Sequence, residues 1–403
     1  MILELHLIQN FAPSNLNRDD TNAPKDCVFG GFRRARISSQ CIKRSVRKHP
    51  AFSEYVLRGG GSVGIRTKRL QQRLAEYFVD NSEKEVDESA LVATMVIELL
   101  GLKIKEKDKT EYLLYFGENE ITEIAQIAMD SWEALLAEGK KNEAEANEDK
   151  AKKETKGKKA KKSKKNAVNK ELKPVESALK GVIGKARKEI RSYAADIALF
   201  GRMVADDKNM NVDAACQVAH AISTHKVDME MDYYTAVDDL LPDGESGSDM
   251  IGTVEFNSSC FYRYANIDLE KLACNLGMTN GDLLISTVKG FIQASVKAVP
   301  TGKQNSMAAQ NPVGYARAIL RNDGFPWSLA NAFQKPIRAT VDKSLETLSV
   351  ERLEAYYQKL AKVYGVDGVV CDKTMNLETG DVSLKDLLDA VGDAVSAQAG
   401  EAK

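Results

Sequence analysis

The chain has 403 residues, of which 43% are hydrophobic, and a formal net charge of -1 at pH 7. This length suggests two or three domains with real cores, and the balanced charge excludes a chain that coats nucleic acid over its whole surface. The six cysteines form no C-x-x-C pair, which argues against a zinc ribbon or a secreted disulfide scaffold. We expect a cytoplasmic protein without a membrane partner, because no apolar run is long enough to span a membrane and no signal peptide is evident.

The first predicted element is a strand. Residues 2–8, ILELHLI, alternate apolar and polar side chains, which predicts a strand with one buried face. His6 falls on the polar side of this pattern. We therefore expect it to be exposed or half-buried and not a ligand.

The next stretch, residues 17–48, is strongly basic. No acidic residue occurs between Asp26 and Glu54. The cations inside that interval are Arg33, Arg34, Arg36, Lys43, Arg44, Arg47 and Lys48. This spacing predicts a concentrated positive surface, placed locally in a chain that is nearly neutral overall.

The second half of this basic stretch predicts a helix over residues 40–48. Ser38 and Ser39 are good N-cap residues, and Ile42 and Val46 would share its buried face. The cations would then project from the exposed flank, beside a helix N-terminus that favours phosphate. A solvated helix face without a ligand is the alternative.

A helical lobe is expected to follow. Residues 67–78, 88–100 and 110–136 carry apolar side chains at helical spacing, and the glycines of residues 59–64 mark a flexible entry. Residues 138–170 are rich in Lys and Glu and have almost no apolar side chain larger than alanine. Because such a segment cannot offset its ordering entropy by burial, we expect a disordered loop or a solvated helix there.

The chain then returns to a globular part. We expect a helix over about 175–200, a strand over 216–224, a strand at 261–267 and a helix at 283–299. His220 and His225 lie too far from other ligand-type residues to predict a metal site. Residues 343–364 are expected to be helical and the tail past 398 to be frayed. This order suits an α+β, ferredoxin-like palm better than a doubly wound parallel sheet.

Residues 227–256 predict two strands around a polar tip. Tyr233, Tyr234 and Ile251 would lie on this hairpin. Composition alone favours packing of these side chains under the hairpin. The alternative is that some protrude and wedge between bases, as aromatic side chains do in single-strand binders.

Several strings of the sequence carry a resemblance to a known family. LNRDDTNAPKDCVFGGFRRARISSQCIKRSVR, at residues 16–47, resembles the amino-terminal signature of the CasC family, the backbone subunits of type I-E CRISPR surveillance complexes (Cascade). The strings that follow in order are GRM at 201–203, AHAISTH at 219–225, YYTAVDDL at 233–240, FYRYANI at 261–267 and LANAFQK at 329–335.

The resemblance implies a hand-like architecture: a modified RNA-recognition (ferredoxin-like) palm, an inserted lobe of helical fingers and a β-hairpin thumb. The implied domains are 1–58, first part of the palm; 59–185, fingers with the Lys/Glu-rich insertion at about 138–170; 186–225, second part of the palm; 226–256, thumb; and 257–403, final part of the palm with C-terminal helices. The insertion has no counterpart that we can place in the family pattern.

The resemblance also implies a function. Subunits of this family polymerise with further copies of themselves as a helical filament along a CRISPR RNA, together with other Cascade subunits, in antiviral defence. They present the guide bases for pairing with target DNA, so sequence reading is delegated to base pairing. We expect no enzymatic activity, cofactor or metal in this chain.

Residue roles follow from the positions that match the family signature. The implied contacts to the guide backbone come from Arg18, Lys25, Ser38, Gln40, Lys43, Arg44 and Arg47. Met203 matches the residue that packs against the kinked base, and Tyr233, Thr235 and Ile251 match the thumb positions that flank it. Tyr233 replaces the family's tryptophan and preserves stacking.

Two other functions compete with this interpretation. A metal-dependent ribonuclease could draw carboxylates from the pairs at 19–20, 206–207 and 238–239. Adjacent acids commonly lie in turns or on opposite faces of a strand, however, and no general base is placed beside these. A general single-stranded RNA binder would show no preference for a repeat-flanked guide and no fixed base interval.

Overall fold

The computed structural model describes residues 1–82, 84–106, 109–154, 170–183, 193–204, 210–237, 239–240, 248–277 and 281–401. The chain forms two compact units. Unit 1 comprises 1–61, 215–274 and 278–403, and unit 2 comprises 62–214 and 275–277. Both units are therefore built from segments that are distant in the sequence.

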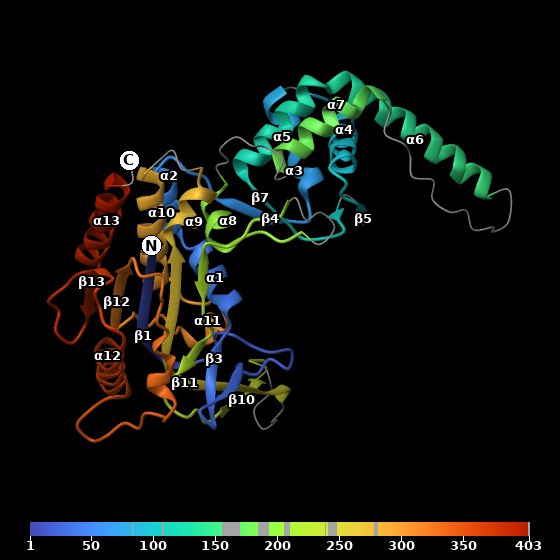
Figure 1. Cartoon of the computed structure of the whole chain (residues 1–403). Coiled ribbons are helices and arrows are strands. Elements are labelled where there is room, and N and C mark those ends of the chain that lie inside the picture. Colours follow the sequence, from blue (N-terminus) through green and yellow to red (C-terminus); the bar gives the residue numbers. More distant parts are fainter. Residues whose placement is uncertain are drawn as a thin grey trace. The chain divides into compact units, whose positions relative to one another are not determined.

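Unit 1 is organised around a nine-stranded sheet in the order β13-β12-β1-β11-β9-β3-β2, with β8 and β10 also pairing with β11 (Figure 1). Its strands are β1 (Ile2–Ser14), β2 (Asp26–Phe29), β3 (Phe32–Ile37), β8 (Cys216–Val218), β9 (Ala221–Ser223), β10 (Glu230–Val237), β11 (Ser248–Asp268), β12 (Tyr315–Arg321) and β13 (Val369–Asn376). The pairings between these strands are antiparallel. The central strand β1 lies between β11 and β12, and Leu7 pairs with Arg263 on one side and Ala316 on the other.

Helices pack on this sheet. They are α1 (Ser39–Lys48), α2 (Pro50–Arg58), α9 (Leu269–Asn275), α10 (Gly281–Lys297), α11 (Gln304–Met307), the 3-10 helix η3 (Leu329–Phe333), α12 (Leu345–Tyr364) and α13 (Leu384–Glu401). Helix α10 packs against α1, α2 and α13. Helix α12 contacts η3 and β1, where Tyr262, Trp327, Phe333 and Leu353 form a buried cluster.

Unit 2 is mainly helical. It contains α3 (Leu70–Ser82), α4 (Val86–Leu99), α5 (Glu118–Asp130), α6 (Trp132–Glu154), η1 (Lys170–Leu172), α7 (Lys173–Ile183) and α8 (Ala195–Phe200), with the two-stranded ribbons β4 (Gly64–Thr67) with β7 (Leu114–Gly117) and β5 (Ile104–Glu106) with β6 (Lys109–Thr110). Leu74, Phe78, Val96 and Ile124 are fully buried in its core. A mixed fold of helices and antiparallel sheet, as predicted, is confirmed.

The environment of β1 corrects one prediction. Both faces of the strand are buried, and His6 has no exposed surface. Its Nδ1 lies 2.9 Å from the Tyr262 hydroxyl and its Nε2 lies 3.3 Å from Glu4 Oε2, while Arg321 Nε lies 3.0 Å from Glu4 Oε1. The polar residues of β1 thus have hydrogen-bond partners in the interior, from β1 itself and from β11 and β12. Helices can therefore cover the face of the strand that the sequence pattern predicted to be exposed to solvent.

Element boundaries also differ from the sequence predictions. The single strand expected over 216–224 is two strands, because β8 pairs with β11 at residues 265–267 whereas β9 bridges β11 and β3. The helical pattern over 110–136 begins with Thr110 of β6 and includes β7 before α5 starts. In place of the helix expected over 175–200 there are α7 and α8. Residues 193–194 before α8 are not helical, and residues 184–192 lie outside the described part. Helix α6 runs to Glu154, and residues 155–169 of the predicted insertion lie outside the described residues. The hairpin of β10 with β11 and helix α12 are confirmed.

Candidate nucleic-acid interface

Helix α1 forms as the sequence predicts. The Ser38 hydroxyl accepts a hydrogen bond from Cys41 N at 3.3 Å, and Ser38 N donates to Asn17 Oδ1 at 2.8 Å. Ile42 and Val46 are buried. Because Ser38 is itself buried and its hydroxyl caps the helix, it orients α1 and has little surface for a ligand.

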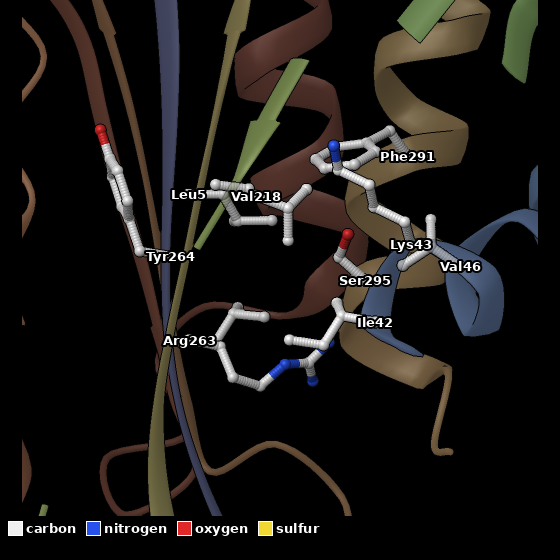
Figure 2. Close-up of a pocket in the computed structure, with 11 residues that line it drawn as sticks. Leu5, Ile42, Lys43, Val46, Val218, Arg263, Tyr264, Phe291 and Ser295 are labelled. Carbon is white, nitrogen blue, oxygen red and sulfur yellow. The ribbon is translucent and has the colours of Figure 1, made fainter. Parts of the chain in front are cut away.

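The other side chains predicted on α1 lie around its exposed flank. Gln40 and Arg44 are exposed, whereas Lys43 and Arg47 are half-buried. Figure 2 shows Lys43 beside Val46 on the side of α1 that meets Phe291 of α10. The space that these residues line there has a volume of about 10 Å³, so it is a packing gap with the volume of about one water molecule.

One arginine of the basic stretch does not join the positive surface that the sequence predicted. Arg34 has no exposed surface, and its guanidinium donates to Ser223 O at 3.0 Å and to Phe333 O at 2.7 Å. The prediction is therefore wrong for Arg34, because its donors are used inside the fold. Arg33 stays exposed as predicted, but an ion pair with Asp26 across the β2–β3 hairpin offsets its charge.

A cavity of about 330 Å³ opens beside α1. Arg18 and Arg44 line it, together with Leu16, Asn17, Asp19, Asn22, Cys41, Ser45, Thr301 and Gly302. Arg18 Nη1 donates to Asn22 Oδ1 at 3.3 Å, which orients the guanidinium. Two exposed guanidiniums with hydroxyl and amide neighbours form a site that can hold a phosphate and its sugar.

Asp19 is the one carboxylate among the residues that line this cavity. Its Oδ1 accepts hydrogen bonds from Thr21 Oγ1 at 2.8 Å, Thr21 N at 2.9 Å and Ala23 N at 3.1 Å. These bonds lower its pKa, so it stays ionised and holds the turn after Arg18. The cations of the cavity still outnumber it.

Lys25 and Arg36 form a second basic group in unit 1. Arg36 N donates to Lys25 O at 2.9 Å, and Arg36 Nη1 lies 3.2 Å from His220 Nδ1. Partial burial, followed by the charges of Arg36 and Lys25, lowers the pKa of the exposed His220. The sequence excluded His220 from a metal site and did not predict this contact with Arg36. In the sequence, the only feature that singled out His220 was its position in the AHAISTH string.

The β10–β11 hairpin presents the three predicted wedge residues on one face. Tyr233 pairs with Thr253, and Thr235 pairs with Ile251, so their side chains share that face. Tyr233 is 61% exposed and Ile251 is 64% exposed. Composition favoured packing for these side chains, and the structure instead places them in solvent. Exposed aromatic and apolar side chains on one face of a hairpin are typical of a surface that another molecule covers.

Met203 lies in unit 2, and 87% of its surface is exposed. The preceding Arg202 is buried and donates from Nη1 to Glu120 Oε2 at 2.8 Å, so the GRM string combines one structural and one exposed side chain.

The carboxylates of the rival nuclease hypothesis are only partly described. Asp20 is exposed next to the turn of Asp19, while Asp206, Asp207 and Asp238 lie outside the described residues. Within the described part of the chain, no group of three His, Cys, Asp or Glu residues is arranged to hold a metal ion. None of its helices is long and apolar enough to cross a membrane.

The fold is that of chains found in CRISPR RNA-guided surveillance complexes. A chain of a solved "CRISPR RNA-guided surveillance complex, pre-nicking" is 29% identical, with a TM-score of 0.73 over 98% of this chain and 100% of that chain. A chain of a second "CRISPR RNA-guided surveillance complex" is 23% identical, with a TM-score of 0.66 over 98% and 100%, and shows the fold alone.

The chain belongs to the family of CT1975-like proteins, whose family model matches residues 3–393. The resemblance to the CasC family that the sequence strings carry is confirmed by this match and by the solved structures. No curated protein matches the sequence.

Proposed function

We propose that this protein is a subunit of a type I-E Cascade complex and forms the backbone that binds CRISPR RNA. Support comes from the family match and from the 29% identical chain of a surveillance complex, which is matched over its whole length. The observation that carries the proposal is the occurrence, in unit 1, of a cation-lined cavity beside α1 together with a hairpin whose Tyr233 and Ile251 stand in solvent.

These two features suit the two tasks of a guide-holding subunit. The sugar-phosphate backbone is bound without sequence reading by the cations Arg18, Lys25, Lys43, Arg44 and Arg47, together with the amide of Gln40. The face of the hairpin with Tyr233, Thr235 and Ile251 displaces a base by stacking or wedging, together with Met203. The remaining bases stay available for pairing with target DNA.

In this proposal the palm comprises residues 1–58, 186–225 and 257–403, the fingers residues 59–185 and the thumb the β10–β11 hairpin. The thumb of one copy folds over guide RNA held by its neighbour. Copies therefore associate head to tail in an open filament, and weak contacts add along one guide. Other Cascade subunits complete the complex, and this chain itself acts without catalysis or a cofactor in the cytoplasm.

The proposal is tested by purifying the protein from its native host, sequencing the RNA that accompanies it and measuring the mass of the complex. We expect repeat-flanked guides of uniform length bound to several copies of the chain. A heterogeneous RNA population on a monomer would favour the general RNA binder. Mg²⁺-dependent cleavage of RNA that Asp20→Ala abolishes would favour the nuclease.

A further inference from the structure

Arg263, in the FYRYANI string, is a buried cation with an uncharged partner. It is 6% exposed, and its Nη1 donates to the neutral Gln9 Oε1 at 2.6 Å. Among the described residues, no carboxylate lies within ion-pairing distance of its guanidinium, and burial lowers its pKa to about 10. The side chain therefore carries a charge at neutral pH that nothing in the described fold neutralises.

Buried arginines elsewhere in the same sheet have several partners, which are carboxylates for Arg317 and backbone carbonyls for Arg34. Arg317 Nη2 lies 2.6 Å from Asp372 Oδ2 and its Nη1 lies 2.7 Å from Glu354 Oε2. Arg317 aligns with His6 and Tyr264 across β12, β1 and β11, so it faces the opposite side of the sheet from Arg263. On the side that α1 covers, Arg263 thus lacks the carboxylate partners that Arg317 has on the other side of the sheet.

Figure 2 shows the Arg263 side chain extending beneath Ile42 of α1, while Tyr264 projects from the other side of the strand. Arg263 also lines a second small interior space, whose walls include Ser45 and Pro300. Ser45 in turn lines the open cavity of Arg18 and Arg44, and Thr301, which follows Pro300, lines that cavity as well. The buried guanidinium is therefore separated from the open cavity by the layer that contains Ser45.

An unpaired buried charge costs stability, and an apolar side chain of similar volume is often neutral or better at such a position. The cost falls when an anion binds close by, because charges in the protein interior are screened much less than charges in water. The neighbouring cavity is the place where an anion is expected if the protein binds RNA.

We propose that Arg263 is a positioning residue for an RNA phosphate bound between Arg18 and Arg44, and acts from behind Ser45 without touching the RNA. This inference rests on the proposed RNA-binding function. The bound phosphate places a negative charge near the buried guanidinium, which has no carboxylate partner in the described fold. Binding therefore lowers the free-energy cost of burying the guanidinium. The Gln9 amide completes the arrangement by donating from Nε2 to Asn311 O at 2.7 Å, which ties β1 to the segment after the Thr301 loop.

The experiment compares Arg263→Met with Arg263→Lys in the full-length protein, using a labelled single-stranded oligouridine as the probe. At an effective dielectric constant of about 20, loss of a unit charge roughly 10 Å from a phosphate lowers affinity about tenfold. We expect a loss of this order in Arg263→Met, recovery of most of the affinity in Arg263→Lys, and an unchanged salt slope because no direct phosphate contact is lost. The melting temperature of free Arg263→Met should equal or exceed that of the wild type.

Arg317→Met is the matched control. It removes a buried guanidinium from the opposite face of the sheet, so it should lower the melting temperature and leave RNA affinity unchanged at temperatures where the variant is folded. If Arg263→Lys binds no better than Arg263→Met, the role of Arg263 is packing and the inference is wrong.

A double variant, Arg18→Ala with Arg44→Ala, separates this inference from the proposed function. If the double variant loses affinity and Arg263→Met does not, only the inference about Arg263 fails. If neither variant loses affinity, the cavity does not bind RNA and the proposed use of this surface fails as well.

Discussion

Arg34 and Arg44 lie in the same basic stretch and have different environments. The guanidinium of Arg34 donates to the backbone carbonyls of Ser223, Phe333 and, at 3.3 Å, Gln334, whereas Arg44 is exposed at the open cavity. Net charge along the sequence cannot distinguish them, because the acceptors of Arg34 come from segments far away in the chain. Predictions about a single residue therefore depend on whether its hydrogen-bond donors already have partners in the folded chain.

Arg34→Met is expected to destabilise the protein. Three backbone carbonyls lose a charged donor, and at about 1 kcal/mol each the free energy of unfolding should fall by roughly 3 kcal/mol. Arg44→Met, at an exposed position, should change stability little. Urea unfolding of both variants measures the difference. Equal stability of the two variants would show that the bonds of Arg34 contribute nothing net.

His220 predicts a pH dependence of RNA binding. Its pKa in the free protein is lowered by partial burial and by the charges of Arg36 and Lys25, so the ring is mainly neutral at pH 7. A bound phosphate would offset those charges and raise the pKa, so binding takes up a proton. RNA affinity should therefore rise as pH falls toward about 6, below the ordinary histidine value.

His220→Gln should flatten that part of the pH profile. His49→Ser is the matched control, because the side chain of His49 caps α2 by accepting from Ala51 N and serine is also a good N-cap. The control should keep the wild-type profile. A profile that is identical in His220→Gln and wild type would exclude His220 from the interface.

At the scale of elements, α1 is the part that the sequence predicts best. Its cap and buried pair are local properties, and the structure has them as expected. Of its cations, Arg44 and Lys48 are exposed as predicted, whereas Lys43 and Arg47 are half-buried. Strand β1 was predicted less well, because the burial of Glu4 and His6 depends on Tyr262 and Arg321, which are hundreds of residues away. Local periodicity can place a strand, but it cannot tell whether a second layer of helices covers its polar face.

Replacing both Lys43 and Arg47 of α1 with alanine should reduce guide affinity and its salt dependence. If each side chain neutralises one phosphate, the slope of log affinity against log salt should fall by roughly 0.7 per residue. Binding measured across a salt series provides the test. Lower affinity with an unchanged slope would indicate that the two residues shape α1 without contacting phosphate.

The hairpin makes a separate prediction. Tyr233→Ala should leave the fold intact, because Tyr233 is 61% exposed, and should cost about 1–3 kcal/mol of stacking on the displaced base. Chemical probing of the bound guide should then lose its regular interval of protected bases. Tyr234→Ala, on the opposite face and packed over Gly252, serves as the control. Periodic protection that survives in Tyr233→Ala would disprove the wedge.

At the scale of the whole molecule, the sequence indicated that a helical part is inserted into a sheet-containing part, because the hydrophobic period changes after residue 51. It did not predict β12 or β13, although β12 pairs with the central strand. C-terminal helices were expected without bounds for α13, which runs to Glu401, past the point at which fraying was predicted. Met203 was singled out only through the family resemblance, since nothing in its local sequence marks an exposed methionine as a ligand contact. Chemistry predicted the basic surface, and the resemblance supplied the roles of individual residues.

The Lys/Glu-rich segment gives the last prediction. The unit 2 core includes Leu135 and Leu136 before this segment and Leu172 and Leu179 after it, and η1 lies against α6. Within the segment, Glu143, Ala144 and Glu145 of α6 are exposed. Replacing residues 143–169 with a short Gly/Ser linker should therefore leave the melting temperature nearly unchanged, because the length of a flexible connection has only a small effect on its closure entropy.

The same replacement should also leave specific guide affinity unchanged, since the proposed backbone contacts come from unit 1 and any contribution of the removed lysines is non-specific and screened by salt. Deleting residues 170–183 in addition removes Leu172 and Leu179 from the core and should lower the melting temperature strongly. A large loss of stability in the first variant would make the segment part of the folded core. Loss of guide affinity with stability retained would instead place RNA contacts within residues 143–169, and the interface would then extend beyond the cavity beside α1.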